Sequence, residues 1–282
     1  ARKFNGEIIS ADSRQIYRGM NIGTGKITKK EMASVKHHLI NIKNPGQNYS
    51  VGRYKKDALN AINKIIASGK LPILAGGTGL YVSAVINNWE IPKIKEDAKL
   101  RKKLEKEITN KGLAFVFKKL VEIDPEAAYI IDPKNPRRVI RAMEIALNSG
   151  KKFSEQRKIG KPLYNILEIG LNPPAKILKK RIAMRINQML NPPTGGGLVK
   201  EVEKLVKKYG YKRKALDAIG YREIICYLRK EISLEESVAQ MNANTIRYAK
   251  RQMTWFKKYN SNTRFVKNKN EAFRLVKKFL KL

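Results

Sequence analysis

The stretch that decides the fold is GEIISADSRQIYRGMNIGTGK, at residues 6–26. Its apolar run at 7–11 is followed by Asp12, Ser13, Arg14 and Gln15. In open parallel α/β sheets, ligands gather at the carboxyl ends of the strands, so we expect a functional rim here. A carboxylate in the position of Asp12 can cap a turn, hold a magnesium-bound water or act as a general base. The sequence alone leaves these roles open.

The segment GTGK at 23–26 looks like a phosphate-binding loop but fails its spacing. A Walker A loop needs Gly, four residues, and then Gly-Lys-Ser/Thr. The first glycine would fall on Met20, and the hydroxyl that binds the metal ion would fall on Ile27. We therefore expect GTGK to form a turn before a helix.

Short apolar runs at 7–11, 38–42 and 71–75 predict strands of a parallel α/β sheet flanked by helices. Between the last two runs lies a helical pattern, with Ser50 as its N-cap and Gly69 as its stop.

Two further expectations concern the sheet. The apolar run YNILEIGLN at 164–172 predicts a strand that returns to it. Gly6 is expected to end a helix, so that 7–11 would be a second strand, with a strand, a loop and most of a helix before it.

The pattern is helical throughout residues 90–161, which predicts an inserted helical subdomain. Residues 1–89 and 162–282 would then form an α/β core with a helical C-terminal part. Within the insertion, Asn135 followed by Pro136 reads as an N-cap and a first helical position.

The charge is the unusual part of the composition. Lys and Arg number 60 against 24 Asp and Glu, a net charge of +36 in 282 residues. Residues 175–282 alone hold 27 basic and 8 acidic residues, a net +19. Such an excess favours a polyanionic partner, nucleic acid ahead of an anionic membrane surface. We expect no membrane association, because no apolar run reaches the length of a spanning helix.

The remaining composition excludes several kinds of site. The single cysteine, Cys226, excludes an intramolecular disulfide and a Cys-rich zinc site, and it suits a reducing cytoplasm. The first residues do not read as a signal peptide. The adjacent His37 and His38 would point to opposite faces of a strand, so we expect no protein-held metal.

Six blocks, taken in order, carry a resemblance to a known family. They are GEIISADSRQIYRGMNIGTGK, HHLINI, PILAGGTGLYVSAVI, DPKNPRRVIRAMEIALNSGK, DAIGYREI and TIRYAKRQMTWF. Together they resemble the tRNA isopentenyltransferase (tRNA dimethylallyltransferase) family over nearly the whole chain. The resemblance implies a P-loop NTPase-like α/β fold with a helical insertion.

The same resemblance implies a reaction. A dimethylallyl group would pass from dimethylallyl diphosphate to the exocyclic amine of the adenosine 3′ of the anticodon. The partners would be a tRNA anticodon stem-loop and dimethylallyl diphosphate, with Mg²⁺ as cofactor, and we expect a monomer. The family's Gly-rich phosphate loop, with its Mg²⁺ ligand, is not among these 282 residues.

By resemblance, the catalytic residues are Asp12 as general base, Thr78 facing the target nucleotide and Arg185 at the diphosphate. Arg181 lies one helical turn before Arg185, and both are expected to bind diphosphate. A solvated basic stripe fits this pair equally well from the residues alone, and core packing fits Trp255 better than base stacking. The residues implied to contact tRNA are Asp12, Ser13, Arg14, Gln15, Thr78, Arg101, Arg137, Arg138, Val139, Ile140, Arg141, Asp217, Ala218, Ile219, Gly220, Tyr221, Arg222, Lys250, Arg251, Gln252, Met253, Thr254, Trp255, Phe256 and Lys257.

Three alternatives compete with this assignment. A sister enzyme that modifies free adenine nucleotides would need neither the +36 charge nor a basic insertion. A non-catalytic RNA-binding protein would leave Asp12 and the GGTG turn at 76–79 without a purpose. A small-molecule kinase would need the phosphate loop that is missing here.

Overall fold

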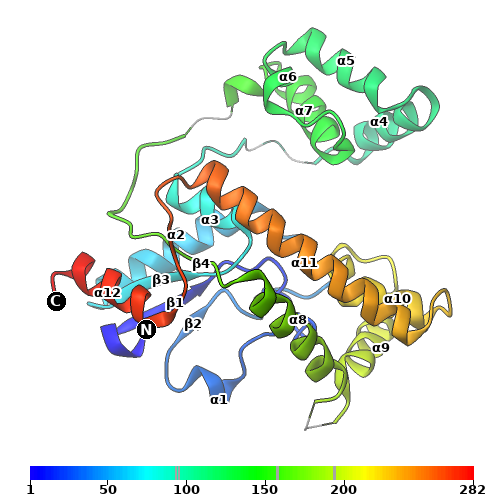
Figure 1. The fold of residues 1–282 in the computed structure, drawn as a ribbon. Helices are drawn as coiled ribbons and strands as arrows, with labels where there is room; N and C mark the ends of the chain where they lie inside the picture. Colours follow the sequence, from blue (N-terminus) through cyan, green and yellow to red (C-terminus); the bar gives the residue numbers. More distant parts are fainter. Residues whose placement is uncertain (93, 95, 157–158, 193–194) are drawn as a thin grey trace. The chain divides into compact units, whose positions relative to one another are not determined.

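The computed structural model describes residues 1–92, 94, 96–156, 159–192 and 195–282, and these divide into two compact units (Figure 1). Unit 1 comprises Ala1–Val85 and Tyr164–Leu282, and unit 2 comprises Ile86–Leu163. The expected insertion at 90–161 falls inside unit 2. Pro193 and Thr194, from the PPTGGG stretch, lie outside the described residues.

Unit 1 is built on a three-stranded parallel sheet with the order β2-β1-β3. The central strand is β1 (Gly6–Ser10), and β3 (Leu71–Ala75) pairs with it from Gly6↔Leu71 to Ser10↔Ala75. The short β2 (His37–His38) pairs with the other edge of β1. Because the strands are parallel, the segments after Ser10 and Ala75 leave the sheet at the same edge.

Helices surround this sheet and extend from it (Figure 1). Their bounds are α1 (Lys29–Met32), α2 (Val51–Ala67), α3 (Gly79–Ile86), α8 (Ala175–Leu190), α9 (Gly197–Tyr209), α10 (Tyr221–Leu228), α11 (Leu234–Tyr259) and α12 (Lys269–Leu280), with 3₁₀ turns at Arg2–Phe4 and Lys214–Leu216. The expected start of α2 is confirmed, since the Ser50 side chain accepts from the Arg53 amide. None of the helices among the described residues is long and apolar enough to cross a membrane.

Three expectations about the sheet were wrong. The run 38–42 leaves the strand after His38, because Leu39 and Asn41 have φ of 61° and 56° in the left-handed region. The run 164–172 forms only β4 (Ile169–Leu171), which pairs with β5 (Arg264–Val266) in a separate two-stranded sheet. The N-terminal turn ends at Asn5, which has φ 46°, and Gly6 already belongs to β1.

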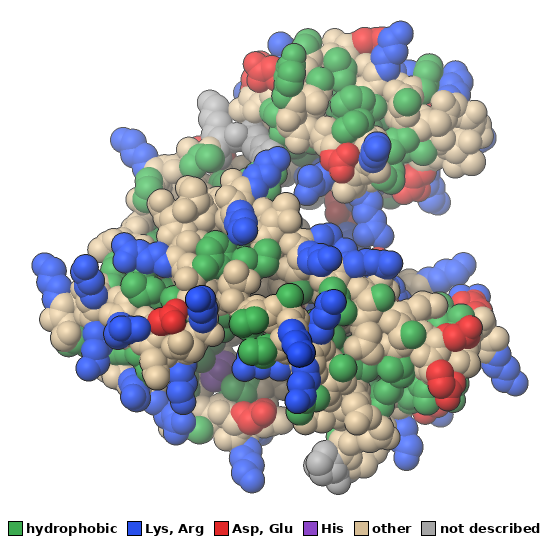
Figure 2. Space-filling view, in the orientation of Figure 1, with side chains coloured by type: hydrophobic (Ala, Val, Ile, Leu, Met, Phe, Trp, Pro, Cys, Tyr) green, Lys and Arg blue, Asp and Glu red, His purple; other side chains and the backbone are tan. Residues whose placement is uncertain are grey.

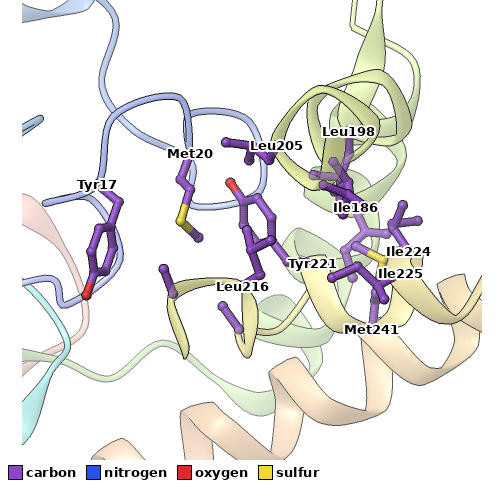
Figure 3. Close-up of a cluster of buried hydrophobic side chains, with 14 of the residues drawn as sticks. Tyr17, Met20, Ile186, Leu198, Leu205, Leu216, Tyr221, Ile224, Ile225 and Met241 are labelled. Carbon is purple, nitrogen blue, oxygen red and sulfur yellow. The ribbon is translucent and has the colours of Figure 1, made fainter. Parts of the chain in front are cut away.

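A large apolar core lies beside the segment that follows β1 (Figure 3). It combines Met20 from that segment with side chains of α8, α9, α10 and α11. Tyr221 is fully buried at its centre and packs with Leu216 and Ile224. This core fixes the position of residues 16–22 against helices that come more than 150 residues later in the chain.

Unit 2 is a helical bundle with its own core. Its helices are α4 (Ala98–Lys111), α5 (Leu113–Ile123), α6 (Ala127–Ile130) and α7 (Pro136–Ser149), with a 3₁₀ turn at Ser154–Gln156. Asn135 caps α7 and Pro136 is its first residue, as expected. Val139 of α7 packs against Leu104 of α4 and Leu120 of α5, and all three are buried.

A buried carboxylate on β1 links this strand to β2 and to the residue that precedes β3. Glu7 on β1 accepts from Lys70 Nζ at 2.7 Å and from His38 Nε2 at 2.7 Å. The hydrogen bonds from Lys70 and then His38 lower the pKa of Glu7 to about 2. His37 Nδ1 lies 2.8 Å from the Val35 carbonyl, so both histidines have structural partners.

This geometry predicts a loss of stability in acid. Because the pKa of Glu7 is depressed in the folded state, its stabilising effect is present above the usual value of 4.5 and is lost as pH falls toward 2. We expect Glu7→Gln to destabilise the protein at pH 7 and the difference from the parent to shrink across that interval. Denaturant unfolding from pH 7 to pH 2 measures this, with Glu203→Gln at an exposed position of α9 as control. A pH-independent difference from the parent would contradict the prediction.

Candidate active site and RNA interface

Asp12 lies where the sequence places it, just past the carboxyl end of β1. Its Oδ1 accepts from the amides of Arg14 at 2.8 Å and Gln15 at 3.2 Å, so the carboxylate closes a turn. No hydrogen bond from the described part of the chain reaches its second oxygen, Oδ2. One carboxylate therefore combines a structural oxygen with one that can take a proton from a ligand.

Thr78 from the GGTG turn lies against the same loop. Its amide donates to the Ala11 carbonyl at 3.1 Å, and its Oγ1 accepts from the Ser13 amide at 3.0 Å. A Cβ on Gly76 would lie 2.4 Å from the carbonyl atoms of Ala11, so only glycine permits this approach. The structure therefore brings Asp12, Ser13 and Thr78 together at the carboxyl ends of β1 and β3.

Close packing explains why glycine occupies positions 23 and 25 of GTGK. A Cβ on Gly23 would lie 2.5 Å from the Tyr221 ring. Gly25 has φ 55°, and a Cβ there would lie 1.6 Å from Nη2 of Arg185. The segment is a turn that precedes α1, as expected, and α1 begins with a capping box between Thr28 and Glu31.

Arg185 on α8 is connected to Asp12 through this turn. Its Nη2 donates to the Thr24 carbonyl at 3.3 Å, and Gln15 Nε2 donates to the same carbonyl at 3.4 Å. Because the Gln15 amide also bonds Asp12, the two proposed catalytic side chains share one hydrogen-bonded frame. Arg181, one turn earlier on α8, is exposed.

Glu201 on α9 is a site-forming residue that the sequence analysis missed. Its carboxylate accepts from the amides of Asn21 at 3.0 Å, Ile22 at 2.8 Å and Gly23 at 3.2 Å. It also accepts from the Tyr221 hydroxyl at 2.6 Å, and burial together with this carboxylate raises the pKa of Tyr221. No local pattern identifies Glu201, because its partners are backbone groups about 180 residues away.

Arg14 has a structural role that its sequence pattern did not indicate. Its Nη1 donates to the carbonyls of Lys214 at 2.9 Å and Ala215 at 3.0 Å, and its Nη2 donates to that of Asp217 at 2.9 Å. The guanidinium thus ties the loop after β1 to the DAIGYR segment at 217–222. Arg14 therefore joins these two segments, and its contact with tRNA stays a prediction.

The DAIGYR segment divides by exposure. Asp217 and Arg222 are exposed and Ile219 is half-buried, whereas Ala218, Gly220 and Tyr221 are buried. Ala218 and Tyr221 belong to the core of unit 1, and the contact of this segment with tRNA stays a prediction.

Helix α11 also has two faces. Lys250, Arg251, Thr254 and Lys257 are exposed, and Met253 and Phe256 are half-buried. Gln252 Nε2 donates to the Gly77 carbonyl at 2.7 Å, and Tyr248 Oη donates to the same carbonyl at 3.3 Å. Trp255 Nε1 donates to Ser83 Oγ at 2.9 Å, and its ring packs on Gly79. Gln252 and Trp255 thus hold the GGTG turn and α3, which agrees with core packing for Trp255.

In unit 2, a buried carboxylate changes the interpretation of two arginines. Glu144 is fully buried and accepts from Arg101 Nε at 3.0 Å, Arg101 Nη2 at 2.9 Å and Arg141 Nη1. Burial alone would raise the pKa of Glu144, but the hydrogen bonds from Arg101 and Arg141 outweigh it and lower the pKa. Arg101 and Arg141 are therefore partners of Glu144, and their contacts with tRNA stay predictions.

The rest of that segment also divides by exposure. The side chains of Val139 and Ile140 are 0% and 8% exposed and belong to the core of unit 2, and the contact of this segment with tRNA stays a prediction. Arg137 and Arg138 lie exposed at the beginning of α7. Figure 2 shows Lys and Arg side chains spread over the visible face of the protein, with few Asp and Glu side chains among them.

Comparison with known proteins gives a consistent result. The model of the IPP transferase family matches residues 15–259. A tRNA dimethylallyltransferase of Bacillus anthracis is 43% identical over 259 residues, which cover 91% of this chain and 81% of that protein. Another, of Acetivibrio thermocellus, is 47% identical over 263 residues, 92% of this chain and 82% of that protein.

Solved structures agree in fold. The full-length tRNA isopentenylpyrophosphate transferase of Bacillus halodurans superposes with a TM-score of 0.71 at 39% identity, covering 99% of this chain and 88% of that one. A eukaryotic dimethylallyltransferase acting on tRNA gives 0.78 at 28% identity, covering 95% and 69%. These matches confirm the expected α/β fold class and the resemblance found in the sequence. The chain belongs to the IPP transferase family.

Proposed function

We propose that this protein is a tRNA dimethylallyltransferase, which transfers a dimethylallyl group from dimethylallyl diphosphate to the exocyclic amine of the adenosine 3′ of the anticodon. Curated relatives with more than 40% identity bear this name, and this chain matches about four fifths of their length. The observation that carries the proposal is the set of hydrogen bonds that connects Asp12 through Gln15 to the Thr24 carbonyl, which also accepts from Arg185.

In the proposed reaction, the adenine amine nitrogen attacks C1 of the dimethylallyl group while the C1–O bond to diphosphate breaks. Asp12 Oδ2 takes the amine proton, since Oδ1 is held by the turn. Arg185 stabilises the negative charge that collects on the departing diphosphate, for which a guanidinium fork is well suited. Thr78, whose Oγ1 accepts from the Ser13 amide, would contact the acceptor base in this reaction.

Mg²⁺ is the cofactor that the family implies. Among the described residues no group of three or more His, Cys, Asp or Glu side chains is placed to hold a metal ion. The proposed steps use only Asp12, Thr78 and Arg185.

Substrate recognition would rest on the positive surface. RNA is read mainly in single-stranded loops with splayed bases, and the target adenosine must leave its stack before the amine can react. Exposed Arg137, Arg138, Lys250 and Arg251 can contact phosphates, which position the RNA without reading its sequence.

The salt dependence of binding tests this assignment. Each neutralised phosphate contributes roughly −0.7 to −0.9 to the slope of log affinity against log salt. Replacing Arg137 and Arg138 together with Gln should make the slope shallower by about one to two units and weaken different tRNAs alike. Arg141 is left in place, because its loss would remove one of the two arginines that bond the buried Glu144 in the core of unit 2.

The matched control is Lys277→Gln with Lys278→Gln, which removes the same charge from exposed positions of α12. The slope of log affinity against log salt for this control should stay within about half a unit of the parent's slope, which is less than the contribution of one phosphate. A transfer assay with free adenine nucleotide runs beside the binding series. Nucleotide modified as efficiently as tRNA, or a flat salt response, would instead support the sister activity on free nucleotides.

A further inference from the structure

Lys26, the last residue of GTGK, is turned into the protein and not toward a ligand. The residue is 9% exposed. Its Nζ donates to the Tyr17 carbonyl at 2.6 Å and to Asn41 Oδ1 at 2.7 Å. The amine thus joins the loop after β1 to the bend that follows β2, in the interior of unit 1.

Asn41 connects Lys26 to the loop that contains Asp12. Its amide donates to the Gln15 carbonyl at 3.1 Å, and the amide of Gln15 donates to Asp12 Oδ1 at 3.2 Å. The left-handed φ of 56° at Asn41 lets its side chain and its amide serve these two partners at once. A continuous path of hydrogen bonds therefore leads from Lys26 through Asn41 and Gln15 to the proposed base.

Burying a charged amine at this position carries an unfavourable desolvation free energy. Burial lowers the pKa of Lys26 to about 8, against the opposing influence of Glu201 and Asp12. The atoms that accept from Nζ are neutral oxygens, so the amine has no direct ion pair among the described residues. Packing alone would be served better by an apolar side chain of similar length, which would carry no desolvation penalty.

We propose that Lys26 is a positioning residue for Asp12, which holds the loop of residues 12–17 in register through Tyr17 and Asn41 without touching the substrate. The role assigned to Asp12 rests on the proposed function. The hydrogen-bonded path does not, and it can be tested without any assay of transfer.

The first test is Lys26→Met, which keeps the length of the side chain and removes both hydrogen bonds. The single-turnover rate of transfer should fall about 10- to 100-fold, because small displacements of a catalytic group cost about that much. The dissociation constant for tRNA should change less than about twofold, since Lys26 is buried and its amine is bonded within the protein. Hydrogen exchange of the Arg14 and Gln15 amides, which bond Asp12, should become faster.

A second variant tests the route. Asn41→Gly keeps the left-handed backbone and the amide to Gln15 but removes the acceptor of Lys26. It should lower the rate in the same direction, and the double variant should be little worse than Lys26→Met alone, because both changes break one path. Fully additive losses would contradict the route through Asn41.

The matched control is Lys70→Met, which removes the lysine that bonds Glu7 at the opposite end of β1. It should lower thermal stability and leave both the transfer rate and the exchange of the Arg14 and Gln15 amides unchanged. The proposal is overturned if Lys26→Met transfers within twofold of the parent, or if Lys70→Met slows transfer equally. A parent that transfers nothing would contradict the proposed function, and the exchange of Arg14 and Gln15 would still decide the role of Lys26.

Discussion

Asp12→Asn should lower the single-turnover rate of dimethylallyl transfer by about 10²- to 10⁴-fold, the usual contribution of a general base. The substitution tests the base separately from the turn, because the amide oxygen of Asn can still accept from the Arg14 and Gln15 amides, which bond Oδ1 in the parent. The turn is kept and the basicity is lost. The affinity for tRNA and the unfolding midpoint should therefore stay close to those of the parent.

Asp12→Ala separates the two roles of the carboxylate. It removes the base and also leaves the Arg14 and Gln15 amides without their acceptor, which costs about 0.5–1.5 kcal/mol per net hydrogen bond. We expect Ala to lose at least as much rate as Asn and to lose stability in addition. If Asn transfers within about threefold of the parent, the carboxylate serves the turn and does not serve as base.

Arg185→Ala is the second large effect that we expect. Removing a group that stabilises charge in the transition state costs about 10²–10³ in rate, and the leaving diphosphate should also bind more weakly. The measurements are the transfer rate at saturating tRNA, the KM for dimethylallyl diphosphate and inhibition by inorganic diphosphate. Binding of tRNA should change much less.

Arg181→Ala is the matched control, because both arginines are exposed on α8 and lie one turn apart. Only Arg185 is held by the Thr24 carbonyl, so its loss should be the more damaging. Gly25→Ala gives independent support, since a Cβ at Gly25 would lie 1.6 Å from Nη2 of Arg185 and must displace the guanidinium. Equal and small effects of Arg181→Ala and Arg185→Ala would place both in a solvated stripe.

Local signals in the sequence predicted the elements well where the cause is itself local. Ser50 and Asn135 cap their helices because a side-chain oxygen reaches an amide three residues ahead. The prediction of a strand at 38–42 was wrong, and the reason is not local. Leu39 and Asn41 adopt left-handed φ, and the Asn41 and Lys43 amides bond the loop after β1.

The meeting of Asp12 with Thr78 could also be predicted, because parallel strands end at one edge of a sheet. The roles of the arginines could not be predicted from the sequence. Arg14, Arg101 and Arg141 look like surface cations in the sequence, yet the first bonds carbonyls about 200 residues away and the other two bond buried Glu144. A guanidinium has the same sequence signature whether it faces water, RNA or a buried partner.

The sequence by itself determined that GTGK is no Walker loop, because spacing and residue type suffice to exclude that role. It also determined the family, since ordered blocks along the chain are enough for that. Only the tertiary structure decided what GTGK does. Gly23 admits the Tyr221 ring, Gly25 admits Arg185, and Lys26 bonds Tyr17 and Asn41. Close approach between segments of different helices and loops is a property of the packed chain, and no stretch of residues encodes it alone.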